Sequence, residues 1–248
     1  AQQPTDRLRF TRQTHQCLTC HSTSQTNHVP GHLVRSVYPS VTGHPVLTAG
    51  SVHTDDSSPL SERWGGWYVT GIHGSQRHMG NVTIAPDASP DQLDMDVGAN
   101  LADLRHLEDR HVGQLDPQRF PIPHSDIVAL RVLEHQTAVH NVLTAASYSA
   151  RITARDAQIM NDALDRETGY ESESTKRRYD SAARKVVDAL LLCREHQLTD
   201  SIQGSSTFAD DFERRGPHDS RHRSLRQFDL KRRLFRYPCS YLIYSESF

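Results

Sequence analysis

The chain has 248 residues, with 28 Lys and Arg against 30 Asp and Glu, for a formal net charge of −2. This balance leaves no global positive field, so we expect no nucleic-acid partner. The mean hydropathy is −0.65, and no apolar run approaches the roughly 20 residues of a spanning helix, so we predict no transmembrane segment in this chain.

The most informative motif lies near the N-terminus, where Cys17, Cys20 and His21 form a CxxCH pattern. Two thiols at this spacing, followed at once by an imidazole, fit the covalent attachment of one haem c. The cysteines would take up two vinyl groups, and His21 would become the proximal iron ligand. A zinc site would want a second ligand pair, and a redox disulfide would want a βαβ pattern nearby. Cys193 and Cys239 are isolated, so haem attachment is the favoured interpretation.

Residues 1–120 are rich in Gly, Pro, Ser and Thr and carry repeated turn signals. We predict that they form a loop-rich haem module, in which the buried porphyrin supplies apolar contact that the side chains lack. The composition changes at residues 120–123, so we place a second, helical domain at residues 121–248.

Residues 62–81 are the predicted wall of the haem site. Both tryptophans, Trp64 and Trp67, lie here among glycines that allow close backbone approach. Aromatic side chains beside Arg63 and Arg77 suit a haem edge, where either guanidinium could pair with a propionate. A tight turn with a small aromatic cluster is the competing interpretation.

Met79 is the leading candidate for the distal iron ligand, because a methionine follows CxxCH by several tens of residues in small monohaem cytochromes. The alternatives are His78 and His73, with His135 as an outside candidate on the long helix. Methionine ligation raises the reduction potential of haem iron relative to two histidines. An empty distal position would instead indicate ligand binding or peroxide chemistry.

The second half carries helix signals. Ser125 is a predicted N-cap with Asp126 in the first turn, and the chain from there to about residue 166 contains no Gly or Pro. Together with a second helix over about 174–197, this segment predicts an antiparallel hairpin. The basic stretch 221–236 is interpreted as a solvated helix face covering apolar stems. The alternative is a docking surface for an acidic redox partner or anionic lipid.

Five segments carry a resemblance to known proteins; they are 17–21, 29–36, 63–71, 77–81 and 237–245. The first resembles c-type cytochromes in general. Together they are similar to a mostly uncharacterised family of bacterial monohaem cytochrome-c-domain proteins. The resemblance implies an exported haem protein and brings no assigned activity. The helical half has no counterpart in small cytochromes c, which argues against a simple soluble shuttle.

The prediction is therefore a mainly α fold, with a cytochrome-c-like haem module followed by a helical hairpin. The expected function is electron transfer by an exported, periplasmic or otherwise extracytoplasmic monohaem cytochrome. Its partners would be a redox protein or the membrane subunits of a respiratory or photosynthetic assembly. The alternatives are a haem enzyme that reduces peroxide or a nitrogen oxide at an open distal site, and a structural subunit. Whether Cys193 and Cys239 form a disulfide is left open.

Overall fold

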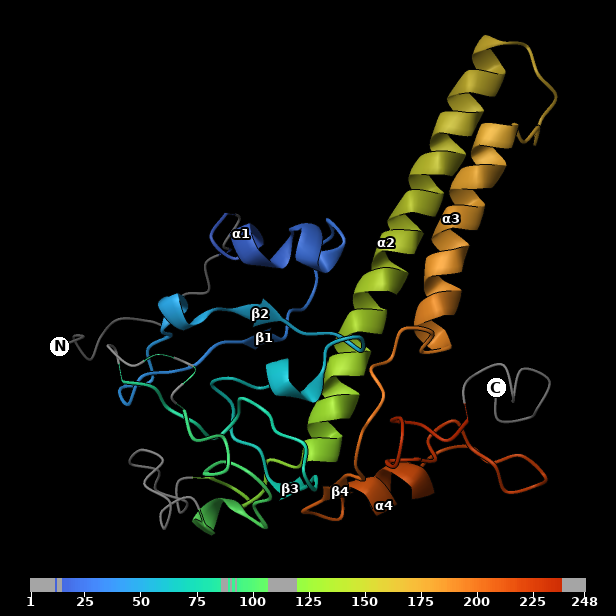
Figure 1. The fold of residues 1–248 in the computed structure, drawn as a ribbon. Helices are drawn as coiled ribbons and strands as arrows, with labels where there is room; N and C mark the ends of the chain where they lie inside the picture. The colour runs from blue at the N-terminus through green and yellow to red at the C-terminus, as the bar shows by residue number, and fades with distance from the viewer. Residues whose placement is uncertain are drawn as a thin grey trace, which may run out of the picture.

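The computed structural model describes residues 12, 15–85, 89, 91, 93–106 and 120–237. Over these residues the protein is mainly helical with little sheet, as the sequence predicted. Figure 1 shows two unequal parts, a loop-rich lobe and a long two-helix arm that rises from it. No helix in the described part is both long enough and apolar enough to cross a membrane.

The lobe is built from short elements joined by turns. Before the long helices these are α1 (Leu18–His21), η1 (Ser24–Thr26), β1 (Arg35–Ser36), η2 (Leu47–Ala49), β2 (Val52–His53), η3 (Leu60–Glu62) and β3 (Gly71–Ile72). The strand β1 pairs antiparallel with β2. The strand β3 pairs antiparallel with β4 (Gln203–Gly204), so a segment beyond the arm returns to the lobe.

Two long helices form the arm: α2 (Ile127–Ala163) and α3 (Glu173–Leu190). They lie antiparallel in Figure 1, so the structure contains the predicted hairpin. The N-cap of α2 is Asp126 and not Ser125, because the Asp126 carboxylate accepts hydrogen bonds from the first turn of the helix. At 1.5 Å per residue the 37 residues of α2 extend about 55 Å.

The main hydrophobic core lies at the base of α2. Its buried members come from the lobe, from α2 and from the segment after α3; they are Leu60, Trp64, Val69, Ile127, Val128, Leu130, Leu198 and Ile202. The segments on the two sides of residue 120 therefore share one core. A smaller cluster inside the lobe contains Tyr38, Met79, Val82 and Ile84.

The basic stretch 221–236 contains no helix, so that part of its interpretation is wrong. Phe228 and Phe235 form an isolated antiparallel bridge, and their rings stack at 5.4 Å between centroids. Phe212 of α4 (Phe208–Arg214) stacks on Phe228 at 5.4 Å. Arg226 lies over the Phe212 ring, 4.9 Å from its centroid. A basic residue of the stretch, Arg226, does cover an apolar group, as the sequence predicted, but this group is the Phe212 ring of α4 and not a stem on a helix of its own.

Candidate haem site

The CxxCH motif forms one short helical turn. The amides of Cys20 and His21 both donate to the carbonyl of Cys17, at 3.3 and 2.9 Å. Both thiols are free, and all three side chains are exposed. The chain therefore presents two thiols and an imidazole on a preformed turn, none of them used by the core, which fits covalent attachment of a porphyrin.

His21 is held in the tautomer that a metal ligand needs. Its Nδ1 lies 2.8 Å from the carbonyl oxygen of Gly31. A carbonyl can only accept, so Nδ1 carries the proton and Nε2 keeps its lone pair. The amide of Gly31 donates back to the His21 carbonyl at 2.8 Å, so two hydrogen bonds join these residues. A ligating histidine oriented by a backbone carbonyl in this way has its ring direction fixed before the metal binds.

Helix α2 braces the loop that orients His21. The buried side chain of Asn141 accepts from the His32 amide at 2.9 Å and donates to the His32 carbonyl at 2.7 Å. A Cβ added at Gly31 would overlap Asn141 Oδ1. The Gly31 carbonyl is thus set by a contact from α2, more than 100 residues later in the chain.

Met79 lies inside the lobe and is 7% exposed. Its Sδ accepts a hydrogen bond from Ser36 Oγ at 3.3 Å, and Ser36 Oγ accepts from the Gly65 amide at 2.7 Å. A thioether is a weak acceptor, so this bond competes only modestly with ligation. The role of Met79 as distal ligand stays a prediction.

His73 and His78 are both buried, with ring centroids 4.7 Å apart. His78 Nδ1 accepts from the Gly80 amide at 3.1 Å, which places its proton on Nε2. His73 Nδ1 lies 2.8 Å from the Gln76 carbonyl, and its Nε2 accepts from the Asn100 amide at 3.0 Å. Burial lowers the pKa of both, that of His78 to about 3, so both are neutral. Neither offers a free lone pair to iron, and this geometry disfavours both as distal ligands.

His135, the outside candidate, joins α2 to the lobe. Its Nδ1 lies 2.8 Å from Asp56 Oδ2, and each side chain is 15% exposed. Its ring meets Phe235 edge to face at 5.7 Å. The contact with a carboxylate places the proton on Nδ1, but both neighbours give the ring a structural role in holding α2 against the 55–58 turn.

Arg63 is fully buried and bound within the protein. Its Nη1 forms an ion pair with Glu134, its Nε donates to the Ser58 carbonyl at 3.1 Å, and its Nη2 donates to the Asp55 carbonyl at 2.6 Å. Burial lowers the Arg63 pKa, and Glu134 opposes that shift. A propionate would have to displace these partners, so the geometry disfavours Arg63 as its ion-pair partner.

Trp64 and His78 place two unused donors close together. Trp64 Nε1 and His78 Nε2 are buried and have no hydrogen-bond partner among the described residues. Their rings meet edge to face at 5.6 Å. Trp64 also adopts a left-handed backbone conformation, φ 66°, which costs a bulky residue about 1–3 kcal/mol. Two buried N–H groups call for an acceptor such as a bound water. Trp64 is fully buried within the main core, so its place at a haem edge stays a prediction.

The two remaining predicted contacts lie nearer the surface. Trp67 is half-buried and donates from Nε1 to the Arg35 carbonyl at 2.9 Å. Arg77 pairs through Nε with Asp96 at 2.5 Å, and its side chain is 34% exposed. Of the two predicted arginines, Arg77 is the one that solvent or a carboxylate can reach.

The sequence-based reasoning missed the buried polar residues of α2. Glu134 is 1% exposed and accepts from Thr54 Oγ1 at 2.8 Å as well as from Arg63. Arg131 pairs with Glu195 at 2.9 Å. Burial raises the pKa of Glu134, against the pull of both arginines. The signal was available, because Arg131, Glu134 and Asn141 fall at helical spacing on the face that starts with Ile127.

The zinc-site and disulfide alternatives depend on other metal-ligating side chains and on the two remaining cysteines. Over the described ranges, no three His, Cys, Asp or Glu side chains lie together as a metal site. Cys193 is an exposed free thiol, while Cys239 falls outside the described residues. No protein-family model, curated protein or solved structure matches this chain. The assignment of the site therefore rests on its own residues.

Proposed function

We propose that this protein is an exported c-type cytochrome that holds one covalent haem and transfers electrons. The observation that supports this best is the exposed His21, whose Nε2 lone pair is kept free by the bond from Nδ1 to Gly31. Cys17 and Cys20 lie on the same turn and would form the thioether bonds. When bound, the haem supplies a one-electron iron couple.

The chain's own residues would set the properties of that couple. The Gly31 carbonyl makes His21 a more basic ligand, which favours oxidised iron and lowers the potential. Asn141 keeps this carbonyl in place, so α2 would tune the proximal side from a distance. Met79 remains the proposed distal ligand, because only a weak bond from Ser36 holds its sulfur. The loop-rich lobe would be the cytochrome-c-like module, and the arm would serve a larger respiratory or photosynthetic assembly.

Attachment is tested by producing the chain together with a haem-attachment system outside the cytoplasm. We expect one covalent haem by mass and by the pyridine haemochrome spectrum. A Cys17→Ser/Cys20→Ser variant should lose it, and Cys193→Ser should keep it. A folded protein without covalent haem under these conditions would sink the proposal.

A second function, a haem enzyme with an open distal site, is favoured by one observation. The lone pairs of His73 and His78 are unavailable, so Met79 is the only remaining candidate in the 62–81 segment. A high-spin ferric EPR spectrum and fast cyanide binding, both unchanged in Met79→Ala, would support the enzyme. A low-spin spectrum that Met79→Ala converts to high-spin would support electron transfer with methionine ligation.

A further inference from the structure

A groove of about 670 Å³ separates the haem-attachment region from the two-helix arm. On the lobe side it is lined by Ser24, Asn27 and His28, only a few residues after His21. On the arm side its α2 lining is small and mostly apolar; these residues are Val142, Ala145, Ala146 and Ser149. The remaining wall comes from α3.

The α3 wall is one continuous and mostly polar face. Its residues recur at intervals of three and four along the helix; they are Ser174, Arg177, Arg178, Ser181, Ala182 and Lys185. This spacing places them on the same side of the helix. From Ser174 to Lys185 the face extends about 16 Å at 1.5 Å per residue. The groove therefore offers cations and hydroxyl groups along a line and not around a point.

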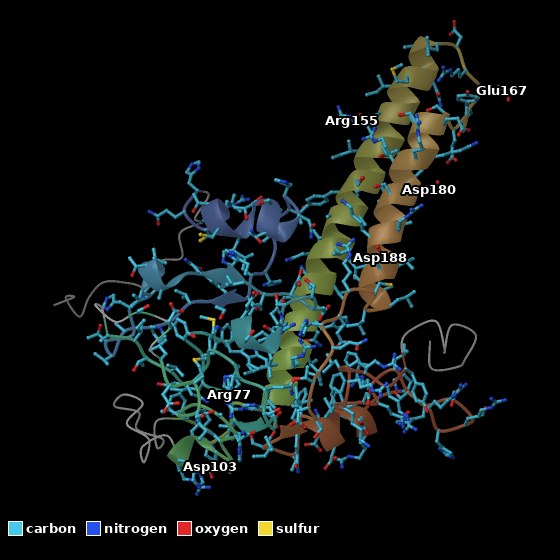
Figure 2. The ribbon with its side chains drawn as sticks, in the orientation of Figure 1. Arg77, Asp103, Arg155, Glu167, Asp180 and Asp188 are labelled. Carbon is cyan, nitrogen blue, oxygen red and sulfur yellow. The ribbon has the colours of Figure 1, made fainter. Side chains whose placement is uncertain are left out.

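The charge of the groove is one-sided, since no Asp or Glu lines it. Arg178 is paired with Asp156 at 2.9 Å. Arg177 and Lys185 are exposed and have no ion-pair partner within the described residues. Arg177 and Lys185 also line an adjoining groove on α3, which contains the acidic residues Asp180 and Asp188; Figure 2 labels both acids on that helix.

We propose that this groove is the docking site for an acidic peptide segment of a protein partner. Arg177 and Lys185 lie eight residues apart, about 12 Å along the axis, farther than one phosphate or carboxylate can span. An extended chain with several carboxylates can reach both cations at once. The serine hydroxyls that line the groove and the Asn27 amide supply further donors.

The position of the groove suggests what the partner does. A segment docked there lies beside the turn that carries Cys17, Cys20 and His21. Opposite charges across an interface steer encounter and fix orientation, as electron exchange requires. Only this last step, a redox partner, rests on the proposed function. The binding of an acidic segment does not depend on haem.

The test uses a fluorescent decaglutamate peptide and the full chain, with binding read by anisotropy at low and at physiological salt. The groove variant is Arg177→Glu/Lys185→Glu. The matched control is Arg151→Glu/Arg155→Glu, which changes the net charge equally on exposed residues of α2 outside the groove; Figure 2 labels Arg155 there. We expect about ten-fold weaker binding for the groove variant and less than about two-fold for the control.

Two results would overturn the proposal: absence of peptide binding at low salt, or an equal loss in both variants. Tighter binding of polyphosphate or of a single-stranded oligonucleotide of equal charge, lost in the groove variant, would show that the occupant class is wrong. Far-ultraviolet circular dichroism verifies that each variant is folded. Haem is measured on the same samples by its spectrum. Peptide binding by protein without covalent haem would support the docking site and refute the proposed cytochrome function. Covalent haem without peptide binding would support the cytochrome function and refute the docking site.

Discussion

The two halves of α2 differ sharply although they belong to one uninterrupted helix. In the half that meets the lobe, residues 127–141 bury charged and polar side chains, among them Arg131, Glu134 and Asn141. In the outer half, residues 142–163, Thr153 is the one buried residue. Large apolar side chains such as Ile152 and Ile159 are more than half exposed there. A helical pattern thus predicts the element, while the neighbouring chain decides which residues are buried.

Residues 127–141, the inner half of α2, are held against the lobe by polar contacts whose loss should lower the free energy of unfolding substantially. Each one satisfies groups that have left water: Glu134 with Arg63, His135 with Asp56, and Asn141 with the His32 backbone. The outer half lies along α3 (Figure 1), and no ion pair or side-chain hydrogen bond to the lobe is found for it among the described residues. We therefore expect large effects from changes in the inner half and small ones from changes in the outer half.

The largest effect is expected from Glu134→Ala. It leaves Arg63 buried without its counter-charge, which costs about 3–5 kcal/mol of the free energy of unfolding. Urea denaturation of both proteins gives this difference. Asp156→Ala is the control, because its pair with Arg178 is about half exposed on both sides, and we expect a loss below about 1 kcal/mol. Similar losses in the two variants would remove the contrast between the halves.

A smaller loss, about 1–3 kcal/mol, is expected from Asn141→Ala, since the His32 amide and carbonyl lose their partners. Gly31→Ala should also destabilise, because its methyl group overlaps Asn141 Oδ1. In a double-mutant cycle, Gly31→Ala/Asn141→Ala should be less destabilised than the sum of the single changes. Additive losses of stability would show that a methyl group at position 31 does not overlap the Asn141 side chain.

Asn141→Ala also tests whether α2 influences the candidate haem site. In protein that carries haem, Asn141→Ala should shift the midpoint potential, because the Gly31 carbonyl that binds His21 is no longer held. A control in the outer half, Thr153→Val, should leave the potential unchanged. An unshifted potential in Asn141→Ala would confine this residue to a role in stability.

In the outer half, Thr153→Val is expected to stabilise the protein by up to about 1 kcal/mol. Thr153 is 1% exposed, and its hydroxyl has no hydrogen-bond partner in the described part of the chain. Valine keeps the shape and removes the unsatisfied group. Thermal unfolding measures the change, and a decrease in Tm would show that the hydroxyl is satisfied in solution.

The smallest effect is expected at the surface of the lobe. Asp103 accepts from the Arg105 side chain at 2.6 Å and from His106 at 3.0 Å, and these bonds, Arg105 first, lower its pKa to about 2. A carboxyl with a lowered pKa stabilises the fold above about pH 4 and loses that contribution as the pH falls toward 2. Arg105 is 68% exposed, so screening keeps the contribution below about 1 kcal/mol.

Asp103→Asn should therefore lower the free energy of unfolding slightly at pH 6 and leave it unchanged near pH 2. Urea titrations of both proteins across this range measure the difference. A difference that grows as the pH falls would have the wrong sign and would refute the assigned role of Asp103.

The local features of this protein could be predicted from its sequence. The spacing of Cys17, Cys20 and His21 is evident in the sequence, while the helical turn that carries them is a finding of the structure. The bounds of α2 and the start of α3 follow from caps and from the lack of Gly and Pro between them. The second helix, expected to reach about residue 197, ends at Leu190, and Leu192 just beyond it adopts a left-handed conformation, φ 52°. The helix expected over 221–236 is absent, because Phe228 and Phe235 stack with each other and with Phe212 of α4. The spacing of residues within this stretch cannot predict a contact with α4.

The rest was decided by tertiary structure. Which side chains of α2 are buried, and which histidines keep a free lone pair, depend on partners distant in the sequence. The partner of Glu134 is Arg63. The Gly31 carbonyl bonds to His21, and the His32 amide next to it is held by Asn141 of α2. By itself the sequence indicated the residues that we propose to attach a haem, because covalent chemistry depends on their identity and spacing. The support that holds His21 in a ligating form came from packing, since a hydrogen bond exists only where the fold brings donor and acceptor together.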